Sequence, residues 1–217
     1  MKVLHISCTY EKSVLPVLEG NFSVIEEFNR IGLISTAQHL NQLNDVKRIL
    51  ESRGKKAVIG GQVLGCNQSN ALNIGPKVDA FLFIGSGLFH PLGIAVKTGK
   101  PVYTLNPYSS SIERIPDSEK ERWFKRQKGR LMKAIEAETF GVLVSVKAGQ
   151  YDLEKALQAC KKIKSKGKKA FLFSGEELSP NNLLPFKVDC WVNTACPRLA
   201  DDKFEKTVIN AEELDLI

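Results

Sequence analysis

Two cysteines occupy positions at which the sequence predicts a strand to give way to a loop. Cys196 follows the apolar run 188–194, and Pro197 and a polar stretch come directly after it. Cys66 follows the glycine-rich segment 60–65, which itself follows a predicted strand. Ligands of open α/β sheets bind outside the carboxyl ends of the strands, where a thiolate can act as a metal ligand. Either cysteine alone reads more simply as a small buried residue, but their matching positions favour two thiols that converge on one site.

The other three cysteines are weaker candidates. Cys190 lies inside an apolar strand pattern, and Cys160 lies on a predicted helix in register with Leu153 and Leu157, so we expect both in the core. Cys8 stays open, because it ends a predicted strand but alternates with apolar residues that would point to a core. Five cysteines without a CxxC pair or a secretory leader disfavour both a zinc knuckle and a disulfide framework.

Two turns carry groups that could bind a small anionic ligand. Gly85, Ser86 and Gly87 follow a predicted strand, and the backbone N–H groups of such a turn can face a carboxylate or a phosphate. An ordinary tight turn is the alternative interpretation. His90 could hold a substrate carboxylate or an adenosine hydroxyl, although a lone histidine is more often structural. The segment Lys147–Gln150 ends a strand in the same way and adds a cationic donor.

An internal repeat indicates the fold class. The pattern of residues 31–35 returns about 110 residues later at 140–144, and the segment 78–86, which opens with Val-Asp, returns at 188–196. Each half reads as strand, helix, strand, loop, short helix and strand, and this alternation predicts a parallel sheet with right-handed crossovers. We therefore expect an α/β protein with two similar parallel-sheet domains.

The repeat also predicts where the domains begin and end. The first α/β repeat is expected over residues 31–110 and the second over residues 130–217, with a polar, charged linker at 111–129. Residues 1–30 read as one short strand and one helix, which cannot fold alone. We expect this segment to be the remnant of a missing N-terminal domain or a docking arm.

Composition and charge exclude several classes of protein. The hydrophobic fraction of 43% is ordinary for a globular protein. An apolar run of about 18 residues and a signal peptide are both absent, so no membrane contact and a cytoplasmic location are expected. The net charge of +7 suits an acidic partner, but the lysines of 161–169 read as a solvated helix face, and direct nucleic-acid binding is not expected. The motifs of phosphate-loop and serine-nucleophile enzymes are also absent.

Several motifs resemble those of one family. The diphthamide synthases, the archaeal 2-(3-amino-3-carboxypropyl)histidine synthases, closely resemble this chain at Gly61–Cys66, at Val146–Gln150 and at Val192–Arg198 with Asp201 and Asp202. They are also similar to it at Thr36–His39 and at Gly85–His90. The resemblance covers nearly the whole chain, and the two cysteine motifs are its most specific part.

The resemblance implies three related α/β domains, each giving one cysteine to a [4Fe-4S] cluster whose open iron binds S-adenosylmethionine. Reduction of the cluster would yield a 3-amino-3-carboxypropyl radical that modifies a histidine of translation elongation factor 2. It implies that Cys66 and Cys196 are the ligands from the second and third domains. The residues expected to bind the cofactor are Gln62, Gly85, Ser86, Gly87, His90, Lys147 and Gln150.

The chain departs from the family pattern in the first domain, of which residues 1–30 resemble only the last strand and helix. Two cysteines leave a cluster of this type one protein ligand short. Cys8 could substitute, a second chain could donate the ligand, or the chain could be a reduced paralogue that no longer makes the radical.

Family members work as homodimers or heterodimers, so the resemblance implies a partner-dependent role beside a second diphthamide synthase chain. The expected function is to bind the cluster and S-adenosylmethionine for transfer of the 3-amino-3-carboxypropyl group. The alternatives are a non-catalytic paralogue that acts as a binding or scaffold subunit, and a related radical transferase with another acceptor.

Overall fold

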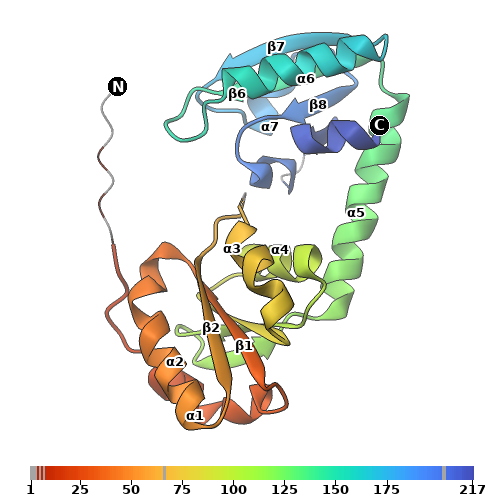
Figure 1. The fold of residues 1–217 in the computed structure, drawn as a ribbon. Helices are drawn as coiled ribbons and strands as arrows, with labels where there is room; N and C mark the ends of the chain where they lie inside the picture. The colour runs from red at the N-terminus through yellow and green to blue at the C-terminus, as the bar shows by residue number, and fades with distance from the viewer. Residues whose placement is uncertain (1–3, 5, 7, 66, 202–203) are drawn as a thin grey trace. The chain divides into compact units, whose positions relative to one another are not determined.

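The computed structural model describes residues 4, 6, 8–65, 67–201 and 204–217 of the chain. The chain divides into two compact units, Met1–Glu121 and Arg122–Ile217, both traced in Figure 1. No helix in the described ranges combines the length and the apolar character that crossing a lipid bilayer requires.

The first unit is built on a five-stranded sheet of order β2-β1-β3-β4-β5, in which only β5 runs antiparallel. Its strands are β1 Arg30–Ser35, β2 Lys56–Gln62, β3 Ala80–Ile84, β4 Val102–Asn106 and β5 Ser111–Arg114. Its helices are α1 Leu15–Gly20, α2 Leu43–Ser52, α3 Ser69–Ile74 and α4 Phe89–Thr98, with 3-10 turns at Phe22–Ile25, Ala37–Gln42 and Gly75–Lys77.

The second unit is built on a four-stranded, all-parallel sheet of order β7-β6-β8-β9. Its strands are β6 Thr139–Ser145, β7 Lys169–Gly175, β8 Cys190–Asn193 and β9 Thr207–Asn210. Its helices are α6 Leu153–Ser165 and α7 Pro180–Leu183, with 3-10 helices at Pro197–Asp201 and Ala211–Leu216, while α5 Asp117–Glu136 leads into the unit. The predicted α/β class, with two similar parallel sheets, is confirmed.

The aspartate of the repeated Val-Asp motif makes an equivalent hydrogen bond in both units. Asp79 lies just before β3, and its carboxylate accepts a hydrogen bond of 2.9 Å from the backbone N–H of Arg30 at the start of β1. Asp189 lies just before β8, and its carboxylate accepts one of 2.8 Å from the N–H of Thr139 at the start of β6. Each carboxylate therefore fixes the start of the neighbouring strand, and this explains why the motif returns in the second half.

Acid should weaken the first of these links. Hydrogen bonding from the Arg30 side chain holds the pKa of the Asp79 carboxyl below its ordinary value. A carboxyl whose pKa is lower in the folded state stabilises the fold above its unfolded-state pKa, and this contribution is lost as the pH falls through the folded-state pKa. Between about pH 5 and pH 3, we expect the urea midpoint of unfolding to fall further in the parent than in the Asp79→Asn variant. Equal losses in the two proteins would contradict this account.

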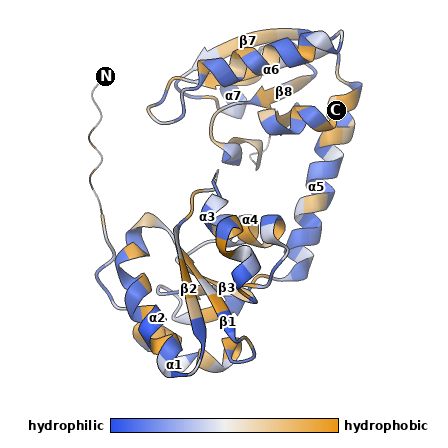
Figure 2. Cartoon of the chain, viewed as in Figure 1, coloured by the Kyte–Doolittle hydropathy of each residue, from blue (hydrophilic) through white to orange (hydrophobic). Residues whose placement is uncertain are grey.

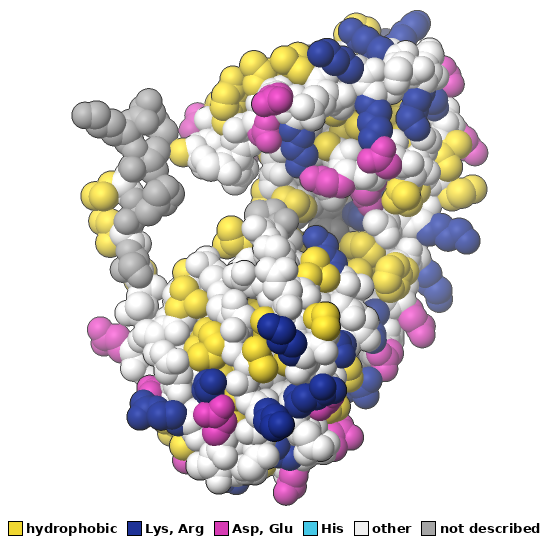
Figure 3. Space-filling view, in the orientation of Figure 1, with side chains coloured by type: hydrophobic (Ala, Val, Ile, Leu, Met, Phe, Trp, Pro, Cys, Tyr) yellow, Lys and Arg dark blue, Asp and Glu magenta, His cyan; other side chains and the backbone are white. Residues whose placement is uncertain are grey.

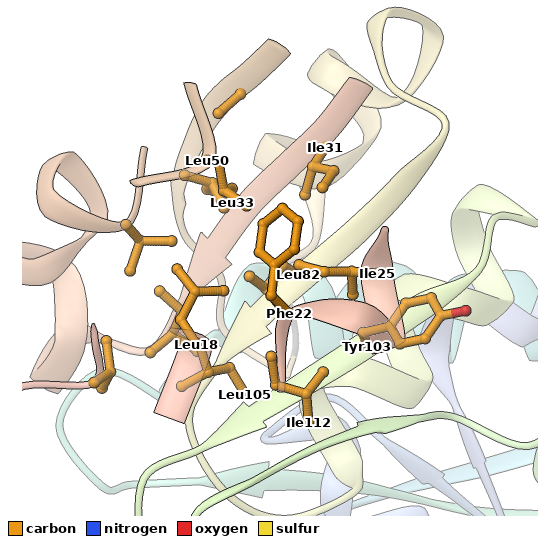
Figure 4. Packing of buried hydrophobic residues seen from close by; sticks show 14 of the residues in the cluster. Leu18, Phe22, Ile25, Ile31, Leu33, Leu50, Leu82, Tyr103, Leu105 and Ile112 are labelled. Carbon is orange, nitrogen blue, oxygen red and sulfur yellow. The ribbon is translucent and has the colours of Figure 1, made fainter. Parts of the chain in front are cut away.

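The amino-terminal segment is part of the first core. Leu18 and Phe22 pack with Leu33 and Leu82 on one face of the sheet, as Figure 4 shows. Of the strand and helix expected in residues 1–30, the helix is present as α1, which ends at Gly20 and is followed by the 3-10 turn Phe22–Ile25. The described positions before Tyr10 form no strand, so the strand predicted there is not found among them. The origin of residues 1–30 in a preceding domain stays a prediction.

The segment expected as a linker, 111–129, is regular. It contains β5, which pairs with β4, and then much of the twenty-residue helix α5. Along α5, every residue of which is described, only Ala134 is buried, and Figure 2 shows the helix as mostly hydrophilic. The polar composition that suggested a linker therefore belongs to an exposed helix.

The lysine-rich helix α6 buries a different face from the one expected. Its buried residues are Ala156, Ala159 and Ile163, whereas Leu153 and Leu157 are 37% and 47% exposed. Cys160 is only partly buried, although it does pack against this core. Several lysines near α6 contact the carboxyl-terminal residues, as in the Lys155–Glu212 ion pair of 2.6 Å. On the face drawn in Figure 3, basic and acidic side chains are interspersed.

Candidate functional site

The carboxyl edge of the first sheet gathers most of the predicted cofactor residues. Ser35 at the end of β1 lies beside Ile84 at the end of β3 on one side and beside Gln62 at the end of β2 on the other. The turn Gly85–Gly87 follows β3 at this edge. Order β2-β1-β3 means that the chain leaves β1 and β3 in opposite directions, and such a switch point is where ligands of open α/β sheets bind.

A bulge interrupts the pairing of β1 with β2 near the carboxyl end of β2. The pairing of β1 with β2 shifts register between Leu33 and Ile34, so that Gly60 is the extra residue. A Cβ on Gly60 would lie 2.5 Å from the Ile34 side chain, and Gly61 has φ of +92°, which disfavours other residues. The glycines therefore allow the strand to bend into the loop that carries Cys66.

Cys66 lies outside the described residues, but its neighbours locate the loop. A Cβ on Gly65 would lie 1.9 Å from the ring of Phe89, so this glycine lets the loop rest on the first turn of α4. His90 is in that same turn, with its ring stacked on Phe83 at a centroid distance of 6.0 Å. The structure therefore brings the residue before Cys66 together with the turn that holds His90.

Polar groups without a described partner are buried at this edge. Among the described residues, the Ser35 and Thr36 hydroxyls and Nδ1 of His39 are buried and make no hydrogen bond. Burial lowers the pKa of the His39 imidazole and so favours its neutral form. Buried polar groups cost free energy unless they are satisfied, so this edge fits a ligand that offers hydrogen bonds. Sequence reasoning named the segment but not these atoms.

The second sheet has the same kind of switch point, between β6 and β8. Lys147 and Gln150 follow β6, and Cys196 follows β8, so the structure brings the ends of these adjacent strands to one edge. Lys147 and Gln150 are exposed, while Cys196 is partly exposed. The loops at this edge carry a thiol after β8 and an ammonium group after β6, groups suited to a metal and to an anionic ligand respectively.

Asn193 holds the Cys196 loop in place. Its side-chain N–H group donates to the Cys196 carbonyl at 2.9 Å, and its side-chain oxygen accepts from the Ala195 N–H at 2.9 Å. Next to it, the Thr194 hydroxyl donates to the Leu143 carbonyl at 2.7 Å. Sequence reasoning missed both residues, although a polar side chain that ends an apolar strand run was a signal for Asn193.

The two cysteines do not follow equivalent strands. Strand order makes β7 the counterpart of β2, and β8 the counterpart of β3. Cys66 therefore follows an edge strand, whereas Cys196 follows a central strand whose counterpart leads into Ser86 and Gly87. The strands that precede the two cysteines in sequence are therefore not equivalent in the two sheets, and the convergence of the two thiols stays a prediction.

The remaining thiols differ sharply from Cys196. Burial, with a smaller contribution from nearby carboxylates, raises the pKa of Cys190 to about 12, and burial also raises the pKa of Cys160. Cys8 is exposed, so the placement against a core that alternation suggested is wrong. In the ranges that the structure describes, no three His, Cys, Asp or Glu side chains are gathered to hold a metal ion.

Comparisons with known proteins agree on one family. A family model described as "Putative diphthamide synthesis protein" matches residues 1–217. The 2-(3-amino-3-carboxypropyl)histidine synthase of Pyrococcus horikoshii is 37% identical over 218 residues, which cover 94% of this chain and 62% of that protein.

Solved structures give the same result. Two crystal structures of Dph2 from Pyrococcus horikoshii, one of them with a 4Fe-4S cluster, match with a TM-score of 0.87 and 36% identity. The match covers 96% of this chain and 63% of the crystallised chain, so this chain spans less than two thirds of its relative's length. With the family model matched from residue 1 to residue 217 and the fold shared with Dph2, the chain belongs to the diphthamide synthesis protein family.

Proposed function

We propose that this chain binds a [4Fe-4S] cluster and S-adenosylmethionine, and takes part in transferring a 3-amino-3-carboxypropyl group to a histidine of translation elongation factor 2. The observation that carries the proposal is the Cys196 loop. It places a partly exposed thiol at the switch point of a sheet, in a chain whose relative has been crystallised with a 4Fe-4S cluster. The role is partner-dependent, in a homodimer or beside another diphthamide synthase chain.

Cys66 and Cys196 would hold the cluster as thiolates, the usual ligands of such clusters. The third ligand would be Cys8, which is exposed, or a group from a second chain. A reduced cluster held there would supply the electron needed to cleave the bond between the sulfur and the γ-carbon of S-adenosylmethionine. The chain's own part is to hold the thiols and to keep the substrate beside them.

The predicted cofactor residues offer groups suited to different parts of S-adenosylmethionine. Lys147 and the N–H groups of Ser86 and Gly87 are donors suited to its carboxylate, whereas the Gly85 N–H donates to the Leu105 carbonyl. Gln62, His90 and Gln150 offer hydrogen bonds to its hydroxyl and amino groups. The unpartnered groups beside Ser35 supply further donors and acceptors for such a polar ligand.

Anaerobic reconstitution with iron and sulfide tests the proposal. We expect the Cys66→Ser, Cys196→Ser double variant to retain about tenfold less iron than the parent, because it loses both thiolate ligands. The Cys160→Ser variant is the matched control, because that thiol is partly buried on α6, and it should load like the parent. Equal iron in the double variant would rule out these ligands.

Transfer to elongation factor 2 separates the proposal from its alternatives. Protein that loads iron and transfers the group, alone or with a partner chain, supports it. Colourless protein that still binds the partner would indicate a scaffold subunit. Loaded protein that cleaves S-adenosylmethionine without modifying elongation factor 2 would indicate another acceptor.

A further inference from the structure

The long helix α5 is hydrogen-bonded directly to the loop that follows Cys196. The 3-10 helix Pro197–Asp201 begins immediately after the cysteine. Near the end of that helix, the Ala200 carbonyl accepts a hydrogen bond of 2.9 Å from Nη1 of Arg130 on α5. A charged donor strengthens such a bond, so Arg130 fixes one end of the loop.

A second route connects α5 to the cysteine itself. Asn193, which donates to the Cys196 carbonyl, also donates to Oδ1 of Asn210 at 2.8 Å. The Asn210 N–H donates to Oε2 of Glu213 at 2.8 Å, and Oε1 of Glu213 accepts from Nε2 of Gln127 on α5 at 2.8 Å. The chain of contacts therefore runs from the cysteine backbone to α5.

Burial makes the hydrogen bonds in this chain of contacts costly to break. Asn193 is 1% exposed and Glu213 is 7% exposed, so breaking one of their hydrogen bonds would leave a buried polar group unsatisfied. Gln127 and Arg130 are three residues apart and thus lie on one face of the helix. One face of α5 therefore holds the Cys196 loop at two points.

We propose that Arg130 and Gln127 on α5 position the Cys196 thiol, through Ala200 and through the Glu213–Asn210–Asn193 chain. The role of the thiol as a cluster ligand rests on the proposed function, but the positioning does not. Since α5 begins at Asp117, within the first unit, the helix that is hydrogen-bonded to this loop also connects the two units along the chain.

Hydrogen exchange of the metal-free chain tests the positioning. In Arg130→Gln and in Glu213→Gln, the peptide covering residues 194–200 should exchange about tenfold faster than in the parent, because the loop opens more often. The control is Arg126→Gln, which removes the same charge from an exposed position one turn earlier on α5. Arg130→Lys keeps a cationic donor and should restore part of the protection.

Iron retention gives a second readout. In reconstituted protein, Arg130→Gln should lose iron to a chelator several-fold faster than Arg126→Gln, with Arg130→Lys in between. Exchange and iron loss in Arg130→Gln that match the control would overturn the proposal. If even the parent takes up no iron, the proposed function fails, while the exchange result still decides the positioning.

Discussion

Replacing Gly141 with alanine is expected to destabilise the second unit by about 3 kcal/mol, because the new methyl group has no room. Gly141 on β6 pairs with Trp191 on β8, and a Cβ at Gly141 would lie 2.2 Å from a ring carbon of that tryptophan. Trp191 is 2% exposed and packs edge-on against Phe173, so the ring cannot move without disturbing the core. Overpacking of this kind forces shifts in the backbone or in side-chain rotamers.

Urea unfolding followed by tryptophan fluorescence would measure this effect. Both tryptophans, Trp123 and Trp191, belong to the second unit, so the signal reports on it. Gly129→Ala is the matched control: its Cβ would meet nothing within 4 Å, and alanine in α5 should stabilise the helix by about 0.5–1 kcal/mol. Replacing the indole ring with a smaller side chain, in Trp191→Leu, should reduce the loss of stability that Gly141→Ala causes. An unchanged urea midpoint in Gly141→Ala would refute the packing argument.

The same glycine-aromatic pair occurs in the first unit, where Gly32 pairs with Phe81 and a Cβ would lie 2.8 Å from its ring. This repetition explains why the fold class could be predicted from the sequence. The central strands β1, β3, β6 and β8 carry their own signal as nearly continuous buried runs, and the helix Leu153–Ser165 carries its own as buried residues at helical spacing. The Val-Asp motif also indicated the third strand of each half, because its aspartate makes the same hydrogen bond to the neighbouring strand in both units.

Other elements carry no such signal. β5 buries only Ile112, so its antiparallel pairing depends on β4 and not on its own pattern. The helicity of α5 comes from good helix formers and from pairs such as Asp117 with Lys120, not from an apolar stripe. At the site, the motifs predicted the loops that carry Cys66 and Cys196, and their role stays a prediction. The position of the Asn193 side chain depends on Asn210 and Glu213, which come later in the chain and contact this region only in the folded unit.

The second large effect concerns two cysteines six positions apart. In metal-free folded protein at about pH 8, we expect iodoacetamide to modify Cys196 at least about a hundredfold faster than Cys190. Cys190 is fully buried, and with its pKa raised to about 12 only about one thiol in ten thousand is ionised at that pH. Cys196 is partly exposed and lies in a loop. Peptide mass spectrometry would give both rates from a single sample.

Denaturation provides the control for this contrast. In concentrated guanidinium, the two cysteines should react at similar rates, because the difference comes from folding and not from the neighbouring sequence. Reconstitution with iron and sulfide should then slow the modification of Cys196 and leave Cys190 unchanged, since a thiolate bound to iron is no longer free to attack. Cys196 that reacts as slowly as Cys190 in the folded, metal-free protein would mean that its thiol is enclosed. An enclosed thiol could not receive an inorganic cluster, so this measurement tests the proposed ligand without any assay of transfer.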